Sequence, residues 1–199
     1  MADDSVAAVH SLGRRPLQLQ HPKLTHHVVN FAHLPALPAV GEVFLALGTT
    51  IKVAGSQQAF RAVDFEANLA VARAARAQGA TKSGVVSAMG ADPRSSIFYN
   101  RVKGELEEAL GSLGFSTLVI ARPSFLSGDR AALGQPLRSG EKLALNLSQW
   151  LAPVIPRNLR SIAATDVAQA LLAAVPSAPG THVLLSGAMQ RAGQHPSRH

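Results

Sequence analysis

The sequence has 199 residues, of which 47% are hydrophobic and 16% are charged, and its formal net charge is +7. This length suits one domain, and this composition supports a buried core and excludes a disordered chain. The absence of cysteine excludes disulfides, thiolate catalysis and cysteine-ligated zinc. The basic residues are scattered without a long run, which argues against a nucleic-acid partner.

The first part of the chain predicts three strands and then a helix. Apolar runs predict strands over residues 5–11, 24–31 and 40–47. The Ala-rich segment 64–78 predicts a helix, because Asp64 is expected to cap its first amides and Gly79 follows its end.

The second part continues the alternation of strands and helices. Strands are predicted over residues 82–87, 117–121 and 182–185, and helices over residues 97–113, 141–151 and 166–175. In the helix 97–113 the residues Glu105, Glu107 and Glu108 are expected to form a solvated face. The domain is expected to cover residues 1–190, and the polar segment 191–199 is expected to be a disordered tail.

This alternation predicts an α/β fold with a mostly parallel sheet, whose ligands bind beyond the carboxyl ends of the strands. The chain shows no signal peptide and no apolar stretch near the ~20 residues of a membrane helix, so we expect a cytoplasmic protein and no membrane partner. No metal site is expected, because His26 and His27 on a strand point to opposite faces. An oligomer is compatible with the sequence.

Tyr99 and Lys103 lie four residues apart on a predicted helix, so their side chains share one face. A nearby ammonium lowers the pKa of a phenol, and a phenol tuned in this way exchanges protons with an alcohol or a carbonyl oxygen. Ser87 ends the preceding predicted strand, and its hydroxyl is expected to polarise a substrate carbonyl. The alternative is a half-buried tyrosine beside a solvated lysine.

Three stretches together resemble the atypical short-chain dehydrogenase/reductases, in the branch of the Tat-interacting-protein family and the sugar-epimerase-like proteins. They are LALGTTIKVAGSQQAFRAVDFEANLAVARAARAQGA, VVSAMGADPRSSIFYNRVKGELEEAL and VIARPSFLSGDR, and the likeness runs from about residue 5 to residue 187. The resemblance implies a doubly wound Rossmann-like sheet in a single domain, with Ser87, Tyr99 and Lys103 as catalytic residues.

The resemblance also implies a cofactor, NADP in preference to NAD. Arg14 and Arg15 follow the second family strand, where a guanidinium can bind the adenosine 2′-phosphate, and no acidic residue stands there. A solvated basic turn is the alternative for this pair. The other cofactor-binding residues implied are Leu47, Gly48, Thr49, Thr50, Val86, Ser87, Tyr99, Lys103, Pro123, Ser124 and Phe125.

One part of the family pattern is absent from this sequence, namely the first strand with its Gly-x-x-Gly-x-x-Gly loop. Only 13 residues precede Arg14, whereas a strand, a loop and a crossover helix need roughly thirty. We therefore expect the first strand of the sheet to be missing and the chain to be an N-terminally shortened form, in which cofactor binding and activity are weakened.

The function expected from these features is that of an NAD(P)-dependent oxidoreductase, which transfers a hydride at a carbonyl or alcohol carbon of a small-molecule substrate. The alternative is a non-catalytic NADP-binding protein that regulates or contacts partners through the same fold.

Overall fold

The computed structural model describes residues 4–124, 126–127, 158, 160–177 and 179–194. The strands are β1 (Val9–Gly13), β2 (Leu24–Val28), β3 (Glu42–Leu45), β4 (Lys82–Val86), β5 (Thr117–Arg122), β6 (Leu126–Ser127), β7 (Ile162–Ala163) and β8 (Gly180–Leu185). The helices are α1 (Ile51–Ala54), α2 (Gln57–Arg61), the π-helix η1 (Ala62–Ala67), α3 (Asn68–Ala77), α4 (Phe98–Gly111), α6 (Ala164–Ser177) and α7 (Ser186–Gln194).

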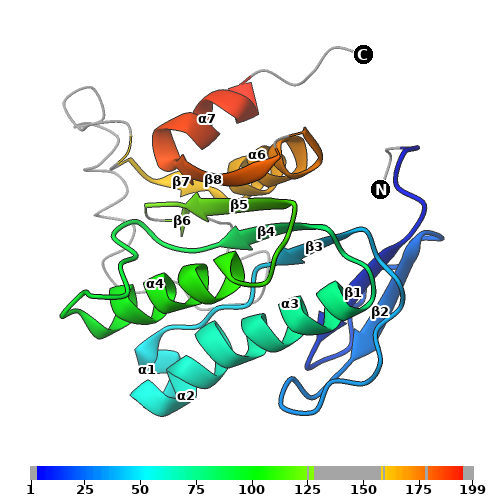
Figure 1. The fold of residues 1–199 in the computed structure, drawn as a ribbon, viewed down its shortest axis with the longest axis horizontal. Helices are drawn as coiled ribbons and strands as arrows, with labels where there is room; N and C mark the ends of the chain where they lie inside the picture. Colours follow the sequence, from blue (N-terminus) through cyan, green and yellow to red (C-terminus); the bar gives the residue numbers. More distant parts are fainter. Residues whose placement is uncertain (1–3, 125, 128–157, 159, 178, 195–199) are drawn as a thin grey trace.

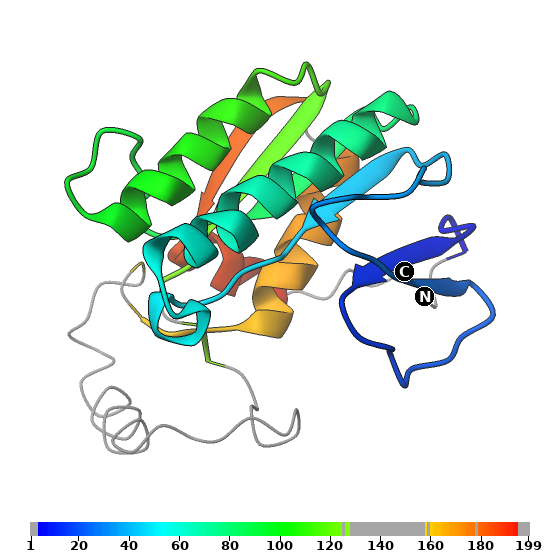
Figure 2. The same ribbon diagram turned by 90° about the horizontal axis from the view of Figure 1, so that it is seen from below.

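A four-stranded parallel sheet forms the centre of the molecule, in the order β3-β4-β5-β8. Helices α3 and α4 cover one face of this sheet, and α6 and α7 lie on the other (Figures 1 and 2). Helix crossovers between parallel strands produce this arrangement, since each connection must return along a face of the sheet. The prediction of an α/β fold with a mostly parallel sheet is confirmed.

Two hydrophobic clusters lie on the two faces of the sheet. Along β5, Leu118 and Ile120 pack toward α3 and α4, while Val119 and Ala121 pack toward α6 and α7. This alternation follows from the two-residue period of a strand, and a strand covered on both faces is apolar throughout. All four side chains are nearly or fully buried.

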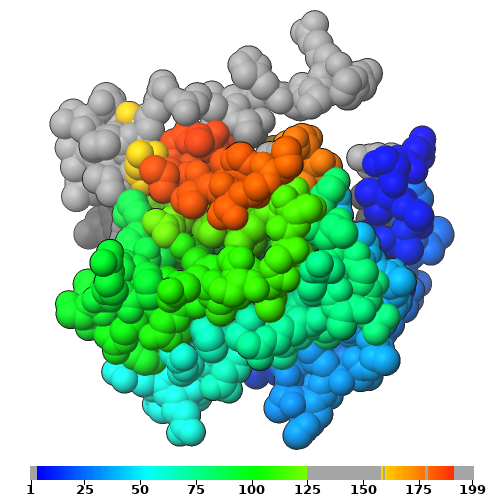
Figure 3. All heavy atoms as spheres, viewed as in Figure 1, coloured from blue at the N-terminus to red at the C-terminus, as the bar shows by residue number. Residues whose placement is uncertain are grey.

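A second, two-stranded parallel sheet contains β1 and β2, with Gly13 opposite Val28 at its end. It lies at one side of the molecule, in blue in the space-filling view (Figure 3). In the Rossmann strand order 3-2-1-4-5-6, β2 takes position 3, β1 takes position 2 and β3 takes position 4. No strand of the described residues takes position 1. Within these residues, β1 and β3 therefore form no backbone hydrogen-bond ladder with each other.

Close packing at two glycines holds the helices against their neighbours. A Cβ atom on Gly84 of β4 would come within 2.9 Å of Val175 Cγ2, so the glycine lets α6 lie close to the sheet. A Cβ on Gly104 of α4 would lie 2.2 Å from the backbone nitrogen of Pro93, which fixes α4 against the loop that precedes it.

The structure differs from the sequence prediction at several elements. Helical structure begins at Ile51, so Asp64 lies inside η1 and the prediction that it caps a helix is wrong. Helix α7 extends to Gln194, into the segment for which we predicted disorder. The short parallel pair β6 and β7 was not predicted. The helix predicted over residues 141–151 lies outside the described residues.

Candidate functional site

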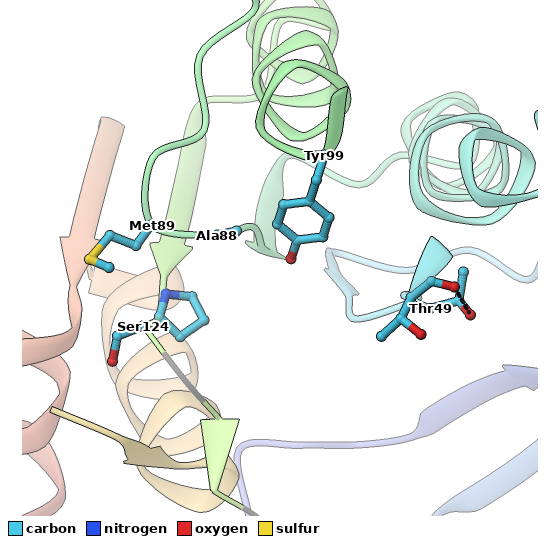
Figure 4. A pocket seen from close by; sticks show the side chains of 7 residues that line it. Thr49, Ala88, Met89, Tyr99 and Ser124 are labelled. Atoms are coloured by element: carbon cyan, nitrogen blue, oxygen red, sulfur yellow. Dashed lines mark hydrogen bonds between the residues drawn. The ribbon is translucent and has the colours of Figure 1, made fainter. Parts of the chain in front are cut away.

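A pocket of about 310 Å³ opens at the carboxyl ends of β3, β4 and β5. The residues that line it are Thr49, Thr50, Ala88, Met89, Tyr99, Pro123 and Ser124 (Figure 4). They follow three adjacent parallel strands, apart from Tyr99, which comes from the first turn of α4. Parallel α/β sheets bind ligands at this edge.

Tyr99 points from α4 toward the strand ends, so that its hydroxyl lies at the pocket between Ala88 and Thr49 (Figure 4). Its ring packs on the fully buried Phe60 of α2, with 5.5 Å between the ring centroids. This contact leaves the phenol edge as the part of the side chain that a ligand can reach.

Lys103 is buried one turn further along α4, and its ammonium forms an ion pair with Asp64 of η1. The distance from Lys103 Nζ to Asp64 Oδ1 is 2.6 Å, and the two side chains are 5% and 0% exposed. Lys103 is not among the residues that line the pocket. The alternative of a solvated lysine is therefore wrong, but the ammonium has a partner that the sequence did not indicate.

The pKa of Tyr99 is raised above its ordinary value of 10.0, first by burial of the phenol and second by the negative charge of Asp64. Both causes disfavour the phenolate. This direction is opposite to the lowered pKa that the sequence predicts, because burial of the phenol and the nearby carboxylate of Asp64 both raise the pKa of Tyr99. Tyr99 therefore keeps its proton at neutral pH.

Ser87 does not line the pocket. It is 4% exposed, and its hydroxyl donates a hydrogen bond to Glu107 of α4. Arg122 donates to the same carboxylate, from Nε to Oε1 at 3.1 Å. Glu107 is itself only 8% exposed, so its assignment to a solvated face is wrong. Its four-residue spacing from Lys103 is the signal that could have indicated this burial.

Ala88 follows Ser87 in the chain and takes the place at the pocket wall where the sequence predicts a serine hydroxyl. Successive residues of an extended segment point to opposite sides, so a shift of one position exchanges a hydroxyl for a methyl group. The geometry thus gives Ser87 a structural partner and leaves its predicted catalytic role without support.

Ser124 and Pro123 form the wall beyond β5. The Ser124 amide donates to Ser186 Oγ at 2.7 Å, and the Ser124 hydroxyl donates to the Arg160 carbonyl. The Pro123 carbonyl accepts from the Met89 amide at 3.0 Å, which ties the loops after β4 and β5 together.

Thr49 and Thr50 form the wall beyond β3. The Thr49 amide donates to Asp64 Oδ2 at 2.8 Å, while Thr50 Oγ1 accepts from the Val53 amide and begins α1. Of their predicted neighbours, Gly48 lies beside the Asp64 carboxylate and Leu47 accepts a hydrogen bond from Asn68.

The remaining predicted cofactor-binding residues lie elsewhere. Arg14 and Arg15 are exposed after β1, and neither lines the pocket. Val86 packs against the cluster under α6. Phe125 lies outside the described residues. No group of three or more potential metal ligands occurs within the described ranges.

No protein-family model matches the sequence. Curated relatives are fungal proteins named "Protein FMP52, mitochondrial". The relative from Coccidioides immitis is 35% identical over 146 residues, which cover 65% of this chain and 59% of that protein. The relative from Emericella nidulans is 40% identical over 100 residues, covering 50% of this chain and 43% of its own length. The chain thus spans about half the length of these relatives.

The names of these relatives bear on the expected location. The relatives from Coccidioides immitis, Emericella nidulans and Candida albicans are all named mitochondrial proteins, which contradicts the expectation of a cytoplasmic protein. None of the helices in the described part of the chain is long and apolar enough to span a membrane.

Solved structures of low sequence identity share the architecture. MoeE5 in complex with UDP-glucuronic acid and NAD has a TM-score of 0.68 at 17% identity, with 92% of this chain and 69% of that chain covered. The ADP-L-glycero-D-manno-heptose-6-epimerase of Helicobacter pylori has a TM-score of 0.61 at 16% identity, with 89% and 68% covered. The chain therefore has the Rossmann-like α/β fold of these proteins.

Proposed function

We propose that the protein binds a nicotinamide dinucleotide at the carboxyl ends of β3, β4 and β5 and reduces the carbonyl group of a small molecule. The observation that carries this proposal is the phenol of Tyr99 in a pocket between the loops that follow three parallel strands. The fold gives further support, since MoeE5, which shares it, holds NAD.

The pocket suits the nicotinamide end of such a cofactor. Its volume of about 310 Å³ and its walls of Ala88, Met89 and Pro123 accept a flat ring, and Thr49, Thr50 and Ser124 offer polar atoms at its margin. The described residues include no Gly-rich loop for the pyrophosphate. Arg14 and Arg15, which are exposed after β1, are proposed as the described residues that bind the adenosine end of the cofactor.

Tyr99, whose pKa is raised, keeps its proton at neutral pH and so can act as the proton donor in a carbonyl reduction. When bound, the reduced dinucleotide supplies a hydride to the carbonyl carbon. The electron pair of the C=O bond passes to the oxygen, which takes the phenolic proton of Tyr99, and solvent then restores that proton. A neutral phenol at the pocket is the form that this step needs.

The substitution Tyr99→Phe tests the proposal. It removes the proton donor and keeps the ring on Phe60, so turnover is expected to fall about 100-fold or more while NADPH binding stays nearly unchanged. NADPH oxidation across a panel of aldehydes and ketones measures the first effect, and NADPH fluorescence measures the second. Equal turnover in the two proteins would remove Tyr99 from the mechanism.

We further propose that the preferred cofactor is NADPH, because Arg14 and Arg15 are exposed after β1 and can bind a 2′-phosphate. The double change of Arg14 and Arg15 to Ala is expected to weaken NADPH binding about tenfold or more, with little effect on NADH. Fluorescence titrations with both cofactors measure this. The control for charge is Lys23→Ala, since Lys23 belongs neither to the Arg14–Arg15 pair nor to the pocket lining. An equal loss of NADH affinity in the double variant would contradict the proposal.

A second candidate is a non-catalytic dinucleotide-binding protein that acts through partners. It is favoured by the arrangement around Ala88, where the pocket has a methyl group while the Ser87 hydroxyl is bound to Glu107. Binding of NADPH without oxidation by any carbonyl of the panel would favour this second candidate over the reductase.

A further inference from the structure

Asp64 is the most deeply buried charged residue near the pocket, with 0% of its surface exposed. Its two carboxylate oxygens have different partners. Oδ1 lies 2.6 Å from Lys103 Nζ on α4, and Oδ2 accepts the Thr49 amide at 2.8 Å from the loop after β3. One side chain thus connects a helix and a loop that each carry a residue lining the pocket, Tyr99 and Thr49.

The local backbone explains why an aspartate can reach this position. Asp64 lies in η1, the π-helical segment Ala62–Ala67 between α2 and α3. A π-turn widens the helix and shifts the side chains that it carries, and such turns occur frequently at functional sites. Asn68 stabilises the segment, since its Nδ2 donates to the Asp64 carbonyl at 3.1 Å and to the Leu47 carbonyl at 2.9 Å.

We propose that Asp64 is a positioning residue of the pocket, whose carboxylate fixes the Lys103 ammonium and the Thr49 amide relative to each other and keeps a negative charge beside Tyr99. The proposal deepens the proposed reductase function and rests on it for its catalytic meaning. Asp64 itself touches neither substrate nor cofactor in this arrangement, because it does not line the pocket.

The charges around Tyr99 make the expected effect specific. Asp64 of η1 is the charged group that raises the pKa of Tyr99, and α2 contributes the neutral ring of Phe60. On α4, Lys103 is paired with Asp64. The other charged pairs on the packed elements are Arg61 with Glu105 and Arg122 with Glu107, and each of these four side chains already has an opposite charge.

The test uses the fact that the chain contains a single tyrosine, so the phenolate absorption band reports Tyr99 alone. Asp64→Asn removes the charge and keeps an oxygen for the Thr49 amide. The absorbance titration of this variant is expected to move to lower pH, because the negative charge that raises the pKa of Tyr99 is gone.

A second measurement separates the positioning role from the charge. Asp64→Ala removes the acceptor as well, so the Thr49 amide is expected to exchange with solvent about tenfold faster, since a lost hydrogen bond of about 1.4 kcal/mol corresponds to that factor. Asp64→Asn is expected to rescue most of this protection. Glu105→Gln, which breaks an ion pair of the same helix on its exposed side, is the control and should leave both readouts unchanged.

An unchanged Tyr99 titration in Asp64→Asn, or an unchanged Thr49 exchange rate in Asp64→Ala, would overturn the proposal. If Asp64→Asn does not fold, the pair Asp64→Asn with Lys103→Met removes both buried charges, and its titration is still expected at lower pH than that of the unchanged protein. Neither the Tyr99 titration nor the Thr49 exchange rate requires turnover. Failure to reduce any carbonyl would therefore count against the proposed function, while the role of Asp64 would still be decided by these two measurements.

Discussion

Ser87 and Ala88 illustrate how much a site can depend on a shift of one residue. The hydroxyl of Ser87 lies in a buried network with Glu107 and Arg122, whereas the methyl group of Ala88 faces the pocket. The sequence places both residues at the end of a strand, but it does not determine which of two successive side chains points to the ligand. The register against β5 decides this, with the Ser87 amide bound to the Ala121 carbonyl.

This arrangement predicts that Ser87→Ala affects stability and not catalysis. The change removes one donor from a buried carboxylate, which is expected to lower the free energy of unfolding by about 1 kcal/mol. Urea unfolding measures this loss, and the turnover of the variant, set beside that of Tyr99→Phe, should stay close to that of the unchanged protein. A stable variant with strongly reduced turnover would return Ser87 to the catalytic role that the sequence first indicated.

The pairing of Tyr99 with Lys103 shows the limit of spacing on one helix. The four-residue interval places both residues on one face of α4, where Lys103 is buried and Tyr99 is half-buried at the pocket. It contains no information about η1, which approaches from elsewhere in the chain and supplies the carboxylate that binds the ammonium. The raised pKa of Tyr99 therefore comes from its burial first and from the charge of Asp64 second, and both depend on tertiary packing.

At the scale of elements, α4 supplies the tyrosine of the pocket and must pack closely against the loop that precedes it. Gly104 allows it to lie against the loop of Asp92 and Pro93, and a Cβ there would lie 2.2–2.3 Å from the backbone of that loop. Gly104→Ala is thus expected to destabilise the protein by about 3 kcal/mol or to prevent folding, because backbone cannot yield as a side chain can. Thermal unfolding measures the effect.

Gly111 provides the matched control for that substitution. It lies at the end of the same helix, and a Cβ on it would meet nothing within 4 Å. Gly111→Ala is expected to leave stability unchanged or to raise it by about 0.5 kcal/mol, since alanine restricts the unfolded chain more than glycine does. Equal destabilisation by the two changes would show that helix packing at Gly104 is not the cause.

The sequence predicted the elements of the central sheet well and the segment before α3 poorly. Residues 117–122 contain the apolar run LVIA and residues 82–86 end in two valines, and this local pattern identifies both segments as strands. The segment from Ile51 to Ala67 is divided among α1, α2 and η1. The buried aspartate of η1 has its partners, Lys103 and Thr49, in other parts of the chain. The conformation of such a segment depends on long-range contacts, and the hydrophobic periodicity of the sequence carries no information about them.

At the scale of the whole molecule, the raised pKa of Tyr99 links stability to pH. The folded state holds the phenolic proton more tightly than the unfolded state, so stability is unaffected well below pH 10.0 and falls as the pH rises above it. Urea unfolding between neutral and alkaline pH should show this decline. In Tyr99→Phe the decline should be smaller, and an identical decline in both proteins would assign it to other groups.

The division of the sheet between β1 and β3 gives the molecule two unequal parts. A lone pair of strands is weakly stable by itself, so the part that carries Arg14 and Arg15 is tied to the rest through side-chain contacts such as those of Leu12 and Phe31. A dinucleotide held at both Arg14 and the Tyr99 pocket would bridge the two parts from outside. Binding of the cofactor would then add contacts between the two parts, and it is expected to raise the temperature at which the β1-β2 sheet unfolds.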